Sequence, residues 1–310
     1  MNEQEPLLQL LRDLKARRYS FTAVTPATHA RVLARPWDGR ADLRDIFGWS
    51  RPFQVSALDD DILRILEAAD ALVIDGDRLR SKVRVASLDA ELFLHSAYPT
   101  DACDAVFFGP DTYRFVAFVR QHLNCLRQCK HVVDMGTGSG AGGILLAKWL
   151  GPQRVSLVDR NPSALRLAGI NAAAAGVSAE LVESDAIPNA DGVIANPPYI
   201  MDKAHRAYRD GGDLFGGAVA LGWVKQGLQR LRPGASFLLY TGAAYVAGEA
   251  PLMRAIEAAC LEAGAGLTWQ EIDPDVFGEE LAQPAYRDVE RIAAVGAIIT
   301  TSDAMAVAEA

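Results

Sequence analysis

The sequence predicts an α/β protein whose doubly wound, mostly parallel sheet of seven strands is preceded by a smaller N-terminal α+β domain. Three observations carry this prediction. From residue 131 onward, strand-like and helix-like segments alternate, which favours parallel strands with helices on both faces of the sheet. A glycine-rich turn joins the first strand of that series to its first helix. The first hundred residues differ, because helices come first and a hairpin follows.

The glycine-rich turn lies in HVVDMGTGSGAGG at residues 131–143. Two β-branched valines suit a buried strand, and Asp134 closes it. Glycines allow positive φ and a close approach of a ligand to the backbone, and the start of the next helix offers free N–H groups. The turn therefore predicts a nucleotide-binding cradle. Its glycines are Gly136, Gly138 and Gly140.

A second strand, residues 154–159, ends in Asp159, which lies 19 residues after Gly140. A carboxylate at this position can accept hydrogen bonds from both ribose hydroxyls. The glycines at 138, 140 and 143 also fit the G-x-G-x-x-G dinucleotide pattern, so an NAD site stays open at this point. Two features favour S-adenosylmethionine instead. One is Asp134, which is placed to hold the amino group of a methionine moiety, and the other is a tetrad after a later strand.

Further strands and helices follow in regular order. Residues 181–184 form a strand, and Asp185 after it can bind the adenine amino group. Proline and glycine at residues 233–234 end the helix that follows the fourth strand. The remaining expected helices are residues 163–175, 218–231 and 252–263, and the remaining strands are residues 192–195, 236–240, 267–272 and 291–300.

The tetrad Asn196, Pro197, Pro198 and Tyr199 follows the fourth strand. Two prolines stiffen a loop at the carboxyl end of this strand, where open α/β sheets bind ligands. A planar amino group is a poor nucleophile because its lone pair is delocalised, so it needs orientation more than a strong base. The side-chain oxygen of Asn196 and the carbonyl of Pro197 can each accept one N–H of such a group, and Tyr199 can stack on its plane. No Ser-His-Asp pattern and no metal-ligand pattern appears in the sequence.

These motifs resemble one known family. The segments VVDMGTGSG, LVDRNPSAL, ESDAIP and VIANPPYI look like the class I S-adenosylmethionine-dependent methyltransferases, in the NPPY branch that methylates amino groups. Within that branch the chain looks most like the release-factor glutamine methyltransferases, on PDT at residues 110–112, NPPYI, and GGDL at residues 211–214. The resemblance covers residues 106–301 and implies the class I methyltransferase fold with an antiparallel last strand. The family's PRP-E-T stretch reads FGPDT here, at residues 108–112.

The resemblance also implies a cofactor, an acceptor and roles for individual residues. The expected cofactor is S-adenosylmethionine, and the expected acceptor is a protein glutamine side chain. An exocyclic base amine in RNA or DNA, or a small molecule, is the alternative acceptor, while a non-catalytic cofactor-binding protein and an NAD-dependent oxidoreductase are less favoured. The expected catalytic residues are Asn196, Pro197 and Tyr199. The expected cofactor-binding residues are Asp111, Thr112, Asp134, Gly136, Thr137, Gly138, Gly140, Asp159, Arg160, Asp185, Ala186 and Asn196.

The first hundred residues are predicted to be a separate unit. LVIDGDRLRSKVRVAS, at residues 72–87, reads as strand, turn and strand, and helices followed by a hairpin suggest a winged-helix-like module. The helices are expected at residues 6–18, 26–33, 43–49 and 59–69. The predicted domains are residues 1–105 for substrate recognition, residues 106–302 for methyl transfer, and a frayed tail at residues 303–310.

Two cationic segments have open interpretations. Arg78, Arg80, Lys82 and Arg84 alternate with other residues, so a strand would put all four on one face. That face is either a solvated strand over an apolar core, or a surface for RNA phosphates or for an acidic protein. The loop at residues 202–213, which contains Lys203, His205, Arg206 and Arg209, is either solvated or a lid over the substrate.

The overall composition limits the classes of partner. The net charge is −8, which disfavours a general polyanion binder. No apolar run reaches the length of a membrane helix, and the N-terminus lacks a secretory signal. Together with cysteines that we expect to be reduced and structural, this predicts a cytoplasmic protein without membrane contact. The cysteines are Cys103, Cys125, Cys129 and Cys260.

Overall fold

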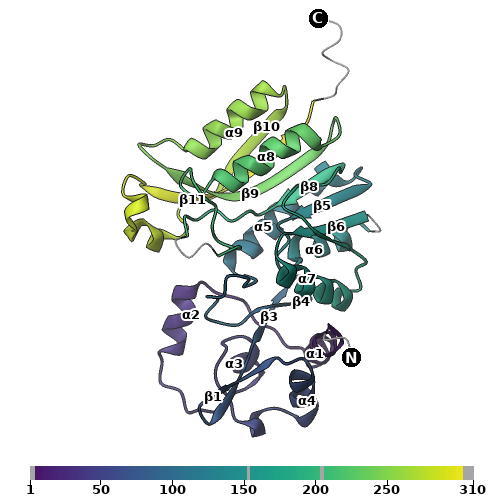
Figure 1. Cartoon of the computed structure of the whole chain (residues 1–310), viewed down its shortest axis with the longest axis vertical. Helices are drawn as coiled ribbons and strands as arrows, with labels where there is room; N and C mark the ends of the chain where they lie inside the picture. Colours follow the sequence, from purple (N-terminus) through teal and green to yellow (C-terminus); the bar gives the residue numbers. More distant parts are fainter. Residues whose placement is uncertain (1–3, 152–153, 203–205, 303–310) are drawn as a thin grey trace, which may run out of the picture.

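The computed structural model describes residues 4–151, 154–202 and 206–302. Figure 1 shows two parts stacked along the long axis of the molecule, with the N-terminal elements at one end and a large sheet flanked by helices at the other. The tail predicted at residues 303–310 lies outside the described residues. In the described part of the chain, no helix is both long enough and apolar enough to cross a membrane.

The large sheet has seven strands in the order β10-β11-β9-β8-β5-β6-β7. Neighbouring strands from β9 to β7 are parallel, and β11 is antiparallel to both β9 and β10. The predicted doubly wound sheet, with its antiparallel last strand, is therefore confirmed. The strand bounds are β5 (His131–Met135), β6 (Arg154–Asp159), β7 (Glu180–Glu183), β8 (Gly192–Ala195), β9 (Ser236–Tyr245), β10 (Gly266–Asp273) and β11 (Arg291–Thr300).

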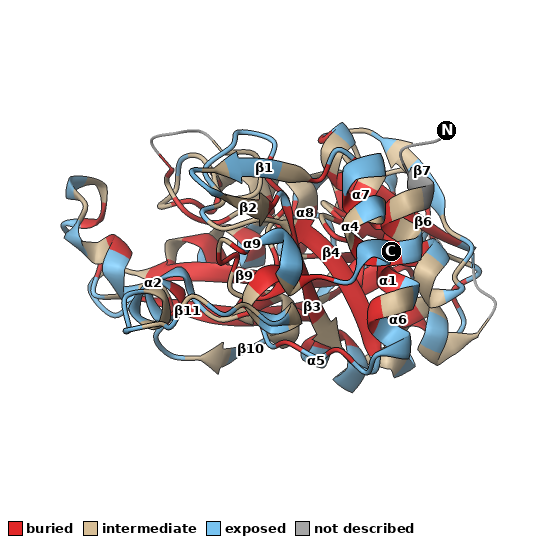
Figure 2. Cartoon of the chain, turned by 90° about the horizontal axis from the view of Figure 1, so that it is seen from below, coloured by how far each residue is buried: buried red, intermediate tan, exposed pale blue. Residues whose placement is uncertain are grey.

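Five α-helices cover the two faces of this sheet. Residues of α5, α6 and α7 share one buried cluster with Val132, whereas residues of α8 and α9 share another with Val133. These two valines are neighbours in β5, so the period of two along a strand divides them between the layers. Figure 2 shows buried strands next to helices whose outer faces are exposed. The helix bounds are α5 (Pro110–Gln121), α6 (Ala141–Leu150), α7 (Pro162–Ala175), α8 (Ala218–Arg230) and α9 (Pro251–Glu262).

The N-terminal part holds four α-helices and two hairpins within its described residues. The predicted hairpin of β1 and β2 is present. The prediction of its second strand is wrong in one respect. The strand was expected to continue through residue 87, but β2 stops before Lys82, and β3 then pairs with β4 in a second hairpin. The Ser81 hydroxyl donates to the carbonyl of Val83 (2.7 Å) and accepts from the N–H of Val83 (3.2 Å), a local pattern that competes with the strand ladder. The bounds are α1 (Gln4–Ala16), α2 (Pro26–Leu33), α3 (Leu43–Phe47), α4 (Asp60–Ala68), β1 (Leu72–Asp75), β2 (Arg78–Ser81), β3 (Val83–Leu88) and β4 (Glu91–Ser96).

The N-terminal part shares its core with α7. Leu14 of α1 belongs to the same buried cluster as Leu167 and Ile170 of α7. The Asn171 side chain accepts from the N–H of Leu94 (2.8 Å) and donates to the carbonyl of the same residue (3.1 Å), which ties α7 to β4. The domain division at residue 105, the winged-helix arrangement and the substrate role of residues 1–105 stay predictions.

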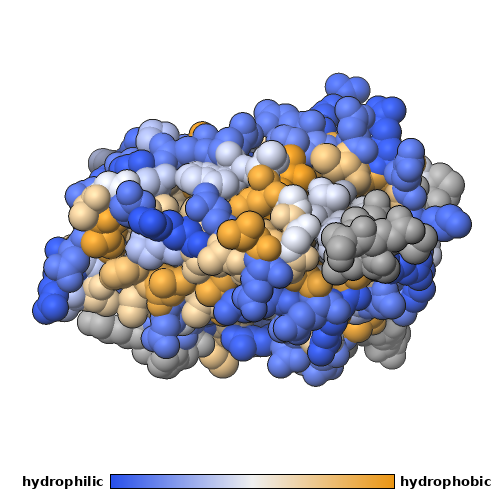
Figure 3. Space-filling view, turned by 90° about the horizontal axis from the view of Figure 1, so that it is seen from above, coloured by the Kyte–Doolittle hydropathy of each residue, from blue (hydrophilic) through white to orange (hydrophobic). Residues whose placement is uncertain are grey.

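Part of the apolar surface lies at the sheet end of the molecule. Figure 3 shows apolar side chains gathered in the middle of this end, between hydrophilic margins. Of the large apolar residues in the described chain, Leu261 is 83% exposed and Ile74 is 80% exposed.

The four cysteines are free, with Cys103 exposed and Cys129 and Cys260 buried.

Candidate active site

A cavity of about 360 Å³ lies at the carboxyl ends of β5, β6 and β8. The chain runs from β5 outward through β6 to β7, and then returns to the other side of β5 as β8. The first strand of the sheet series therefore lies at the point where the strand order reverses, which is where open α/β sheets bind ligands. The cavity is lined by the glycine-rich turn, the end of β6, the tetrad after β8, and segments from α5, α7, α8 and the loops above the sheet.

The glycine-rich turn has the backbone conformation that its glycines predict. Gly136, Gly138 and Gly140 have φ values of 68°, 54° and 83°, a region that favours glycine. A side chain at Gly136 would also meet the ring of Trp223, since an added Cβ would lie 2.5 Å from the nearest ring carbon. Gly140 is the N-cap of α6. The turn is thus held close against its surroundings, with free space above Gly138.

Asp159 connects the end of β6 to the glycine-rich turn. One carboxylate oxygen accepts from the N–H of Gly138 (2.9 Å), and the other accepts from the N–H of Asn161 (2.9 Å). Burial raises the pKa of Asp159, and these two hydrogen bonds oppose the shift. The carboxylate lines the cavity and can accept further hydrogen bonds, because each oxygen has two lone pairs. Its position suits the two hydroxyls of a ribose.

Asp134 lies beneath the cavity instead of facing it. Its side chain is 2% exposed, and one oxygen accepts from the Thr137 hydroxyl (2.7 Å) and from the N–H of Gly143 (2.8 Å). Burial raises the pKa of Asp134 to about 6, although both hydrogen bonds lower it. Asp134 therefore fixes the turn from below, and its contact with a methionine amino group stays a prediction.

The other expected site residues are brought together, with two further exceptions. Gly140 and Ala186, like Asp134, are not among the residues that line the cavity. The expected residues that do line it are Asp111, Thr112, Gly136, Thr137, Gly138, Asp159, Arg160, Asp185, Asn196, Pro197 and Tyr199.

The tetrad after β8 forms one wall of the cavity, with all four of its residues on the lining. The Tyr199 ring is packed within the chain. An added Cβ at Gly242 would lie 2.2 Å from this ring, and the Phe277 ring meets it edge-on at 5.6 Å. The Tyr199 hydroxyl is buried, has no hydrogen bond of ordinary length in the described part of the chain, and interacts with the Asp111 carboxylate. Stacking of Tyr199 on an acceptor stays a prediction.

Asp111 occupies the first turn of α5, where the sequence places the start of a helix at Pro110. The Tyr240 hydroxyl of β9 donates to Asp111 Oδ1 (2.8 Å), and an Arg114 guanidinium nitrogen lies 3.4 Å from the same oxygen. Arg114 also pairs with Asp273 of β10 (2.9 Å). Burial raises the pKa of Asp111, while the hydroxyl and guanidinium contacts lower it.

Sequence reasoning missed several parts of the lining. Val219, Gly222, Trp223 and Gln226 of α8 line the cavity at positions i, i+3, i+4 and i+7, which is one face of a helix. That spacing was the available signal, but the segment reads equally as a helix that covers the sheet. Phe107 and Tyr208 also line the cavity, and their rings stack at 5.5 Å with an angle of 4° between their planes.

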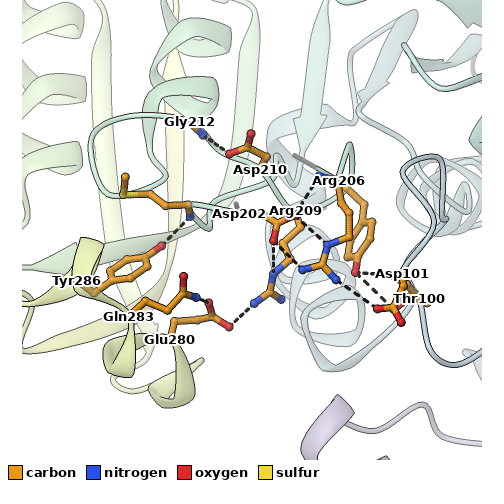
Figure 4. A network of polar contacts seen from close by, with 12 residues as sticks. Thr100, Asp101, Asp202, Arg206, Arg209, Asp210, Gly212, Glu280, Gln283 and Tyr286 are labelled. Carbon is orange, nitrogen blue, oxygen red and sulfur yellow. Dashed lines mark hydrogen bonds and ion pairs between the residues drawn. The ribbon is translucent and has the colours of Figure 1, made fainter. Parts of the chain in front are cut away.

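The loop after the tetrad is tied to two other segments, as Figure 4 shows. Asp202 accepts from Arg206 through both oxygens (2.9 and 2.6 Å), and Arg209 pairs with Glu280 of the segment before β11. The Tyr208 hydroxyl donates to the carbonyl of Thr100, which lies between β4 and α5 (3.0 Å).

Two of the loop's four expected cations therefore have partners within the chain, and Lys203 and His205 lie outside the described residues. The lid stays a prediction. Within the described ranges, no group of three or more His, Cys, Asp or Glu side chains is placed to hold a metal ion.

The donor set fits S-adenosylmethionine. The half-buried Asp159 carboxylate suits a ribose, the N–H of Gly138 donates to it, and the amide side chain of Asn196 lines the same cavity. Asp185, which is exposed at the rim of this cavity, is available for a base amino group. The same features give no separate support to NAD.

Comparisons with known proteins agree with this geometry. Residues 117–220 match the family model of the methyltransferase small domain. A release factor glutamine methyltransferase of Koribacter versatilis is 34% identical over 36% of this chain and 46% of its own length. A ribosomal RNA small subunit methyltransferase C of Ectopseudomonas mendocina is 32% identical over 32% of this chain and 34% of its own length. The chain thus spans less than half the length of these two relatives.

A longer match and a solved structure complete the comparison. A release factor glutamine methyltransferase of Deinococcus radiodurans is 28% identical over 66% of this chain and 74% of its own length. The crystal structure of Trm5b from Pyrococcus abyssi has a TM-score of 0.50 and 16% identity, over 78% of this chain and 68% of that one, which shows a shared fold. With the match to the methyltransferase small domain at residues 117–220 and the seven-stranded sheet, the sheet domain of this chain has the class I methyltransferase fold.

Proposed function

We propose that this chain transfers a methyl group from S-adenosylmethionine to a planar amino or amide nitrogen, and that the acceptor is a protein glutamine side chain. The observation that carries the proposal is the tetrad of residues 196–199, which lines the same cavity as the glycine-rich turn and Asp159. A planar nitrogen beside this tetrad and a cofactor on the turn would meet within one cavity.

In this proposal Asp159 holds the ribose, and the N–H groups of the glycine-rich turn and the start of α6 receive the methionine end. Asp185 binds the base at the rim of the cavity. When bound, S-adenosylmethionine supplies an electrophilic methyl group on a positively charged sulfur. The turn cannot shift easily, because Asp134 fixes it through Thr137 and Gly143.

Asn196 and Pro197 orient the acceptor nitrogen. The side-chain oxygen of Asn196 and the carbonyl of Pro197 each accept one N–H, which favours a tetrahedral nitrogen whose lone pair points at the methyl group. The prolines hold these two oxygens in place. Orientation of this kind contributes to the rate because the reacting atoms no longer have to find their geometry in the reaction itself.

The charge distribution supports a protein acceptor over a nucleic acid. The net charge is −8, whereas nucleic-acid binding depends on cations that are free to meet phosphates. In the cationic stretch of residues 78–84, Arg80 donates to Asp75 (3.1 Å) and Lys82 pairs with Asp70 (2.9 Å). Two of its four charges are therefore balanced by neighbouring acids.

An exocyclic base amine in RNA is the second candidate. The observation that favours it is the 32% identity to a ribosomal RNA methyltransferase. Glutamine is placed first because the longer match is to a release factor glutamine methyltransferase, over 66% of this chain.

Labelling distinguishes the two acceptors. The purified chain is incubated with S-adenosylmethionine tritiated on the methyl group and with a bacterial cell extract, and portions are then treated with nuclease or with protease. We expect label that survives nuclease and is lost to protease, and acid hydrolysis of the labelled protein should release methylamine from a methylated side-chain amide. Label lost to nuclease alone would overturn the protein assignment and favour the RNA base.

A purified bacterial release factor serves as a defined acceptor in the same assay. Labelling of this protein, followed by replacement of its methylated glutamine, would establish the substrate class. Failure to label any component of the extract would overturn methyl transfer itself.

A further inference from the structure

Asp111 has a free carboxylate oxygen in the cavity. The residue is 5% exposed and lines the cavity with Asn196 and Tyr199. Oδ1 accepts from the Tyr240 hydroxyl (2.8 Å) and lies 3.4 Å from Arg114. No hydrogen bond of ordinary length from the described residues reaches Oδ2, and the buried Tyr199 hydroxyl is the neighbouring polar group that also interacts with this carboxylate. Oδ1 therefore fixes the side chain, and Oδ2 keeps lone pairs that can accept from a ligand.

The proposed reaction needs a proton acceptor. A nitrogen that gains a methyl group carries a positive charge until it loses a proton, and the prolines of the tetrad and the Phe107 ring, which line the same cavity, cannot accept that proton. A buried carboxylate on the lining of the same cavity as the tetrad can accept this proton. We propose that Asp111 accepts, through Oδ2, the proton that the acceptor nitrogen loses on methylation; this inference rests on the proposed function.

The step balances in atoms and electrons. The nitrogen lone pair forms the new N–C bond, and the bond between the methyl carbon and sulfur breaks with its electron pair left on sulfur. An N–H bond then breaks, its electron pair returns to nitrogen, and the proton binds Oδ2 to give a neutral carboxylic acid. Asp111 gives this proton to water when the product leaves. No oxidant or further reactant takes part.

Other polar groups on the cavity lining suit this role less well. Asp159 holds the ribose in the proposed function and is fixed by two backbone N–H groups, and Asp185 is exposed. Burial holds the pKa of the Tyr199 hydroxyl well above its usual value, so that hydroxyl keeps its proton. Burial also raises the pKa of Asp111, which makes it a stronger base near neutral pH.

Asp111→Asn tests the assignment, because an amide keeps the shape and its oxygen still accepts from Tyr240. With methyl-tritiated S-adenosylmethionine and a purified bacterial release factor, we expect kcat to fall by about 100-fold or more. The acidic limb of the kcat against pH profile should disappear, and Asp111→Glu should restore it. Affinity for S-adenosylhomocysteine, measured by calorimetry, should change less than about twofold.

A second measurement is independent of turnover. In protein labelled with ¹³C at aspartate carboxyls, the resonance that Asp111→Asn removes should titrate above the range of the exposed aspartates. Asp61→Asn is the matched control, since Asp61 also lies in the first turn of a helix and pairs with an arginine three residues later, but is exposed. It should change neither the profile nor the affinity.

The outcomes separate the possible roles of Asp111. A large loss of S-adenosylhomocysteine affinity with an intact acidic limb would make Asp111 a cofactor ligand and overturn the inference. An unchanged profile would overturn it as well. If the wild-type chain labels neither the release factor nor any extract component, the proposed function fails; if the wild-type chain labels and Asp111→Asn keeps its profile, only the inference fails.

Discussion

The carboxyl ends of the parallel strands and the cationic stretch of residues 78–84 both place several polar side chains within a short length of chain, but they use them differently. At the strand ends, Asp159 and Asn196 come from different strands and face one cavity. These side chains converge because parallel strands have their carboxyl ends at the same edge of the sheet. The polar groups there keep free hydrogen-bonding capacity toward a ligand.

The side chains of the cationic stretch have fewer hydrogen-bonding groups left for a ligand. Arg78 donates to the carbonyl of Gly39 (3.1 Å), and Arg84, which is 4% exposed, donates to the carbonyl of Ser96 (3.0 Å). Burial lowers the pKa of Arg84 to about 10. The difference teaches that a polar side chain indicates a ligand site only where the chain leaves its hydrogen bonds unfilled.

Replacing Asn196 by alanine should have the largest effect on function, because Asn196 carries the only amide side chain of the tetrad. Asn196→Ala should lower methyl transfer by about 100-fold or more, as loss of a single orienting or charge-stabilising group does in other enzymes. Calorimetry should find the affinity for S-adenosylhomocysteine nearly unchanged. An equal loss of affinity and turnover would mean that the tetrad only supports the cavity.

The Asp159→Ala variant should have the next largest effect, on the cofactor itself. Each hydrogen bond from a ribose hydroxyl to a charged acceptor contributes about 1.5–3 kcal/mol, so affinity for S-adenosylhomocysteine should fall roughly tenfold or more. Asp159→Asn is the companion variant, since it keeps one acceptor for the N–H of Gly138. Unchanged affinity in both variants would remove Asp159 from the ribose site.

The fold was predictable from the sequence because its signals are local. Buried strands of the sheet read as apolar runs, and prolines and glycines mark the ends of most helices. The second hairpin was missed because Ser81 breaks the strand through hydrogen bonds to Val83, and one side chain in an alternating pattern does not reveal such a break. The shared core of α1 and α7 depends on contacts between residues more than 150 positions apart, which no local pattern contains.

The site was predictable to the extent that it depends on backbone geometry. Positive φ at Gly136 and Gly138 favours glycine, and strand ends place Asp159 and Asn196. Trp223 was missed because its role depends on how α8 packs over the turn, and the same spacing serves an ordinary covering helix. Asp134 was placed on the correct strand, but its orientation depends on the Thr137 hydroxyl.

Asp134→Asn should change the pH dependence of stability. The folded pKa of about 6 lies above the value of about 3.9 for an unfolded aspartate, so the folded state binds the proton more tightly. The stabilisation from this group is fully present below pH ~3.9 and is lost as pH rises through about 6. Asparagine can accept from Thr137 and Gly143 without this loss.

The free energy of unfolding in urea, measured from pH 4 to 8, checks this prediction. The free energy of unfolding of Asp134→Asn minus that of the wild type should increase with pH up to about pH 6 and then level off. Asp61→Asn, an exposed control, should show no such rise. A difference that does not vary with pH would show that Asp134 has an ordinary pKa.

Neutralising the paired cations should have the smallest effect. In the double variant Arg80→Gln and Lys82→Gln, each lost charge has an acid neighbour in the chain, Asp75 and Asp70. Exposed and half-exposed ion pairs contribute about 0–1 kcal/mol, so stability should change little. With a protein acceptor, neither KM nor its dependence on salt should change beyond error.

The same double variant offers a direct way to contradict the comparison between the two regions. If these cations leave their acids to bind RNA phosphates, the slope of log affinity against log salt concentration should become shallower by about 0.7–0.9 for each lost contact. Binding of labelled bacterial RNA between 50 and 300 mM salt measures this slope. Arg154→Gln is the control for a general loss of charge, because Arg154 is an exposed arginine at the start of β6 that also pairs with an acid, Glu180. A shallower slope in the double variant alone would make the cationic stretch a ligand surface, because only phosphate contacts at residues 80 and 82 could produce it.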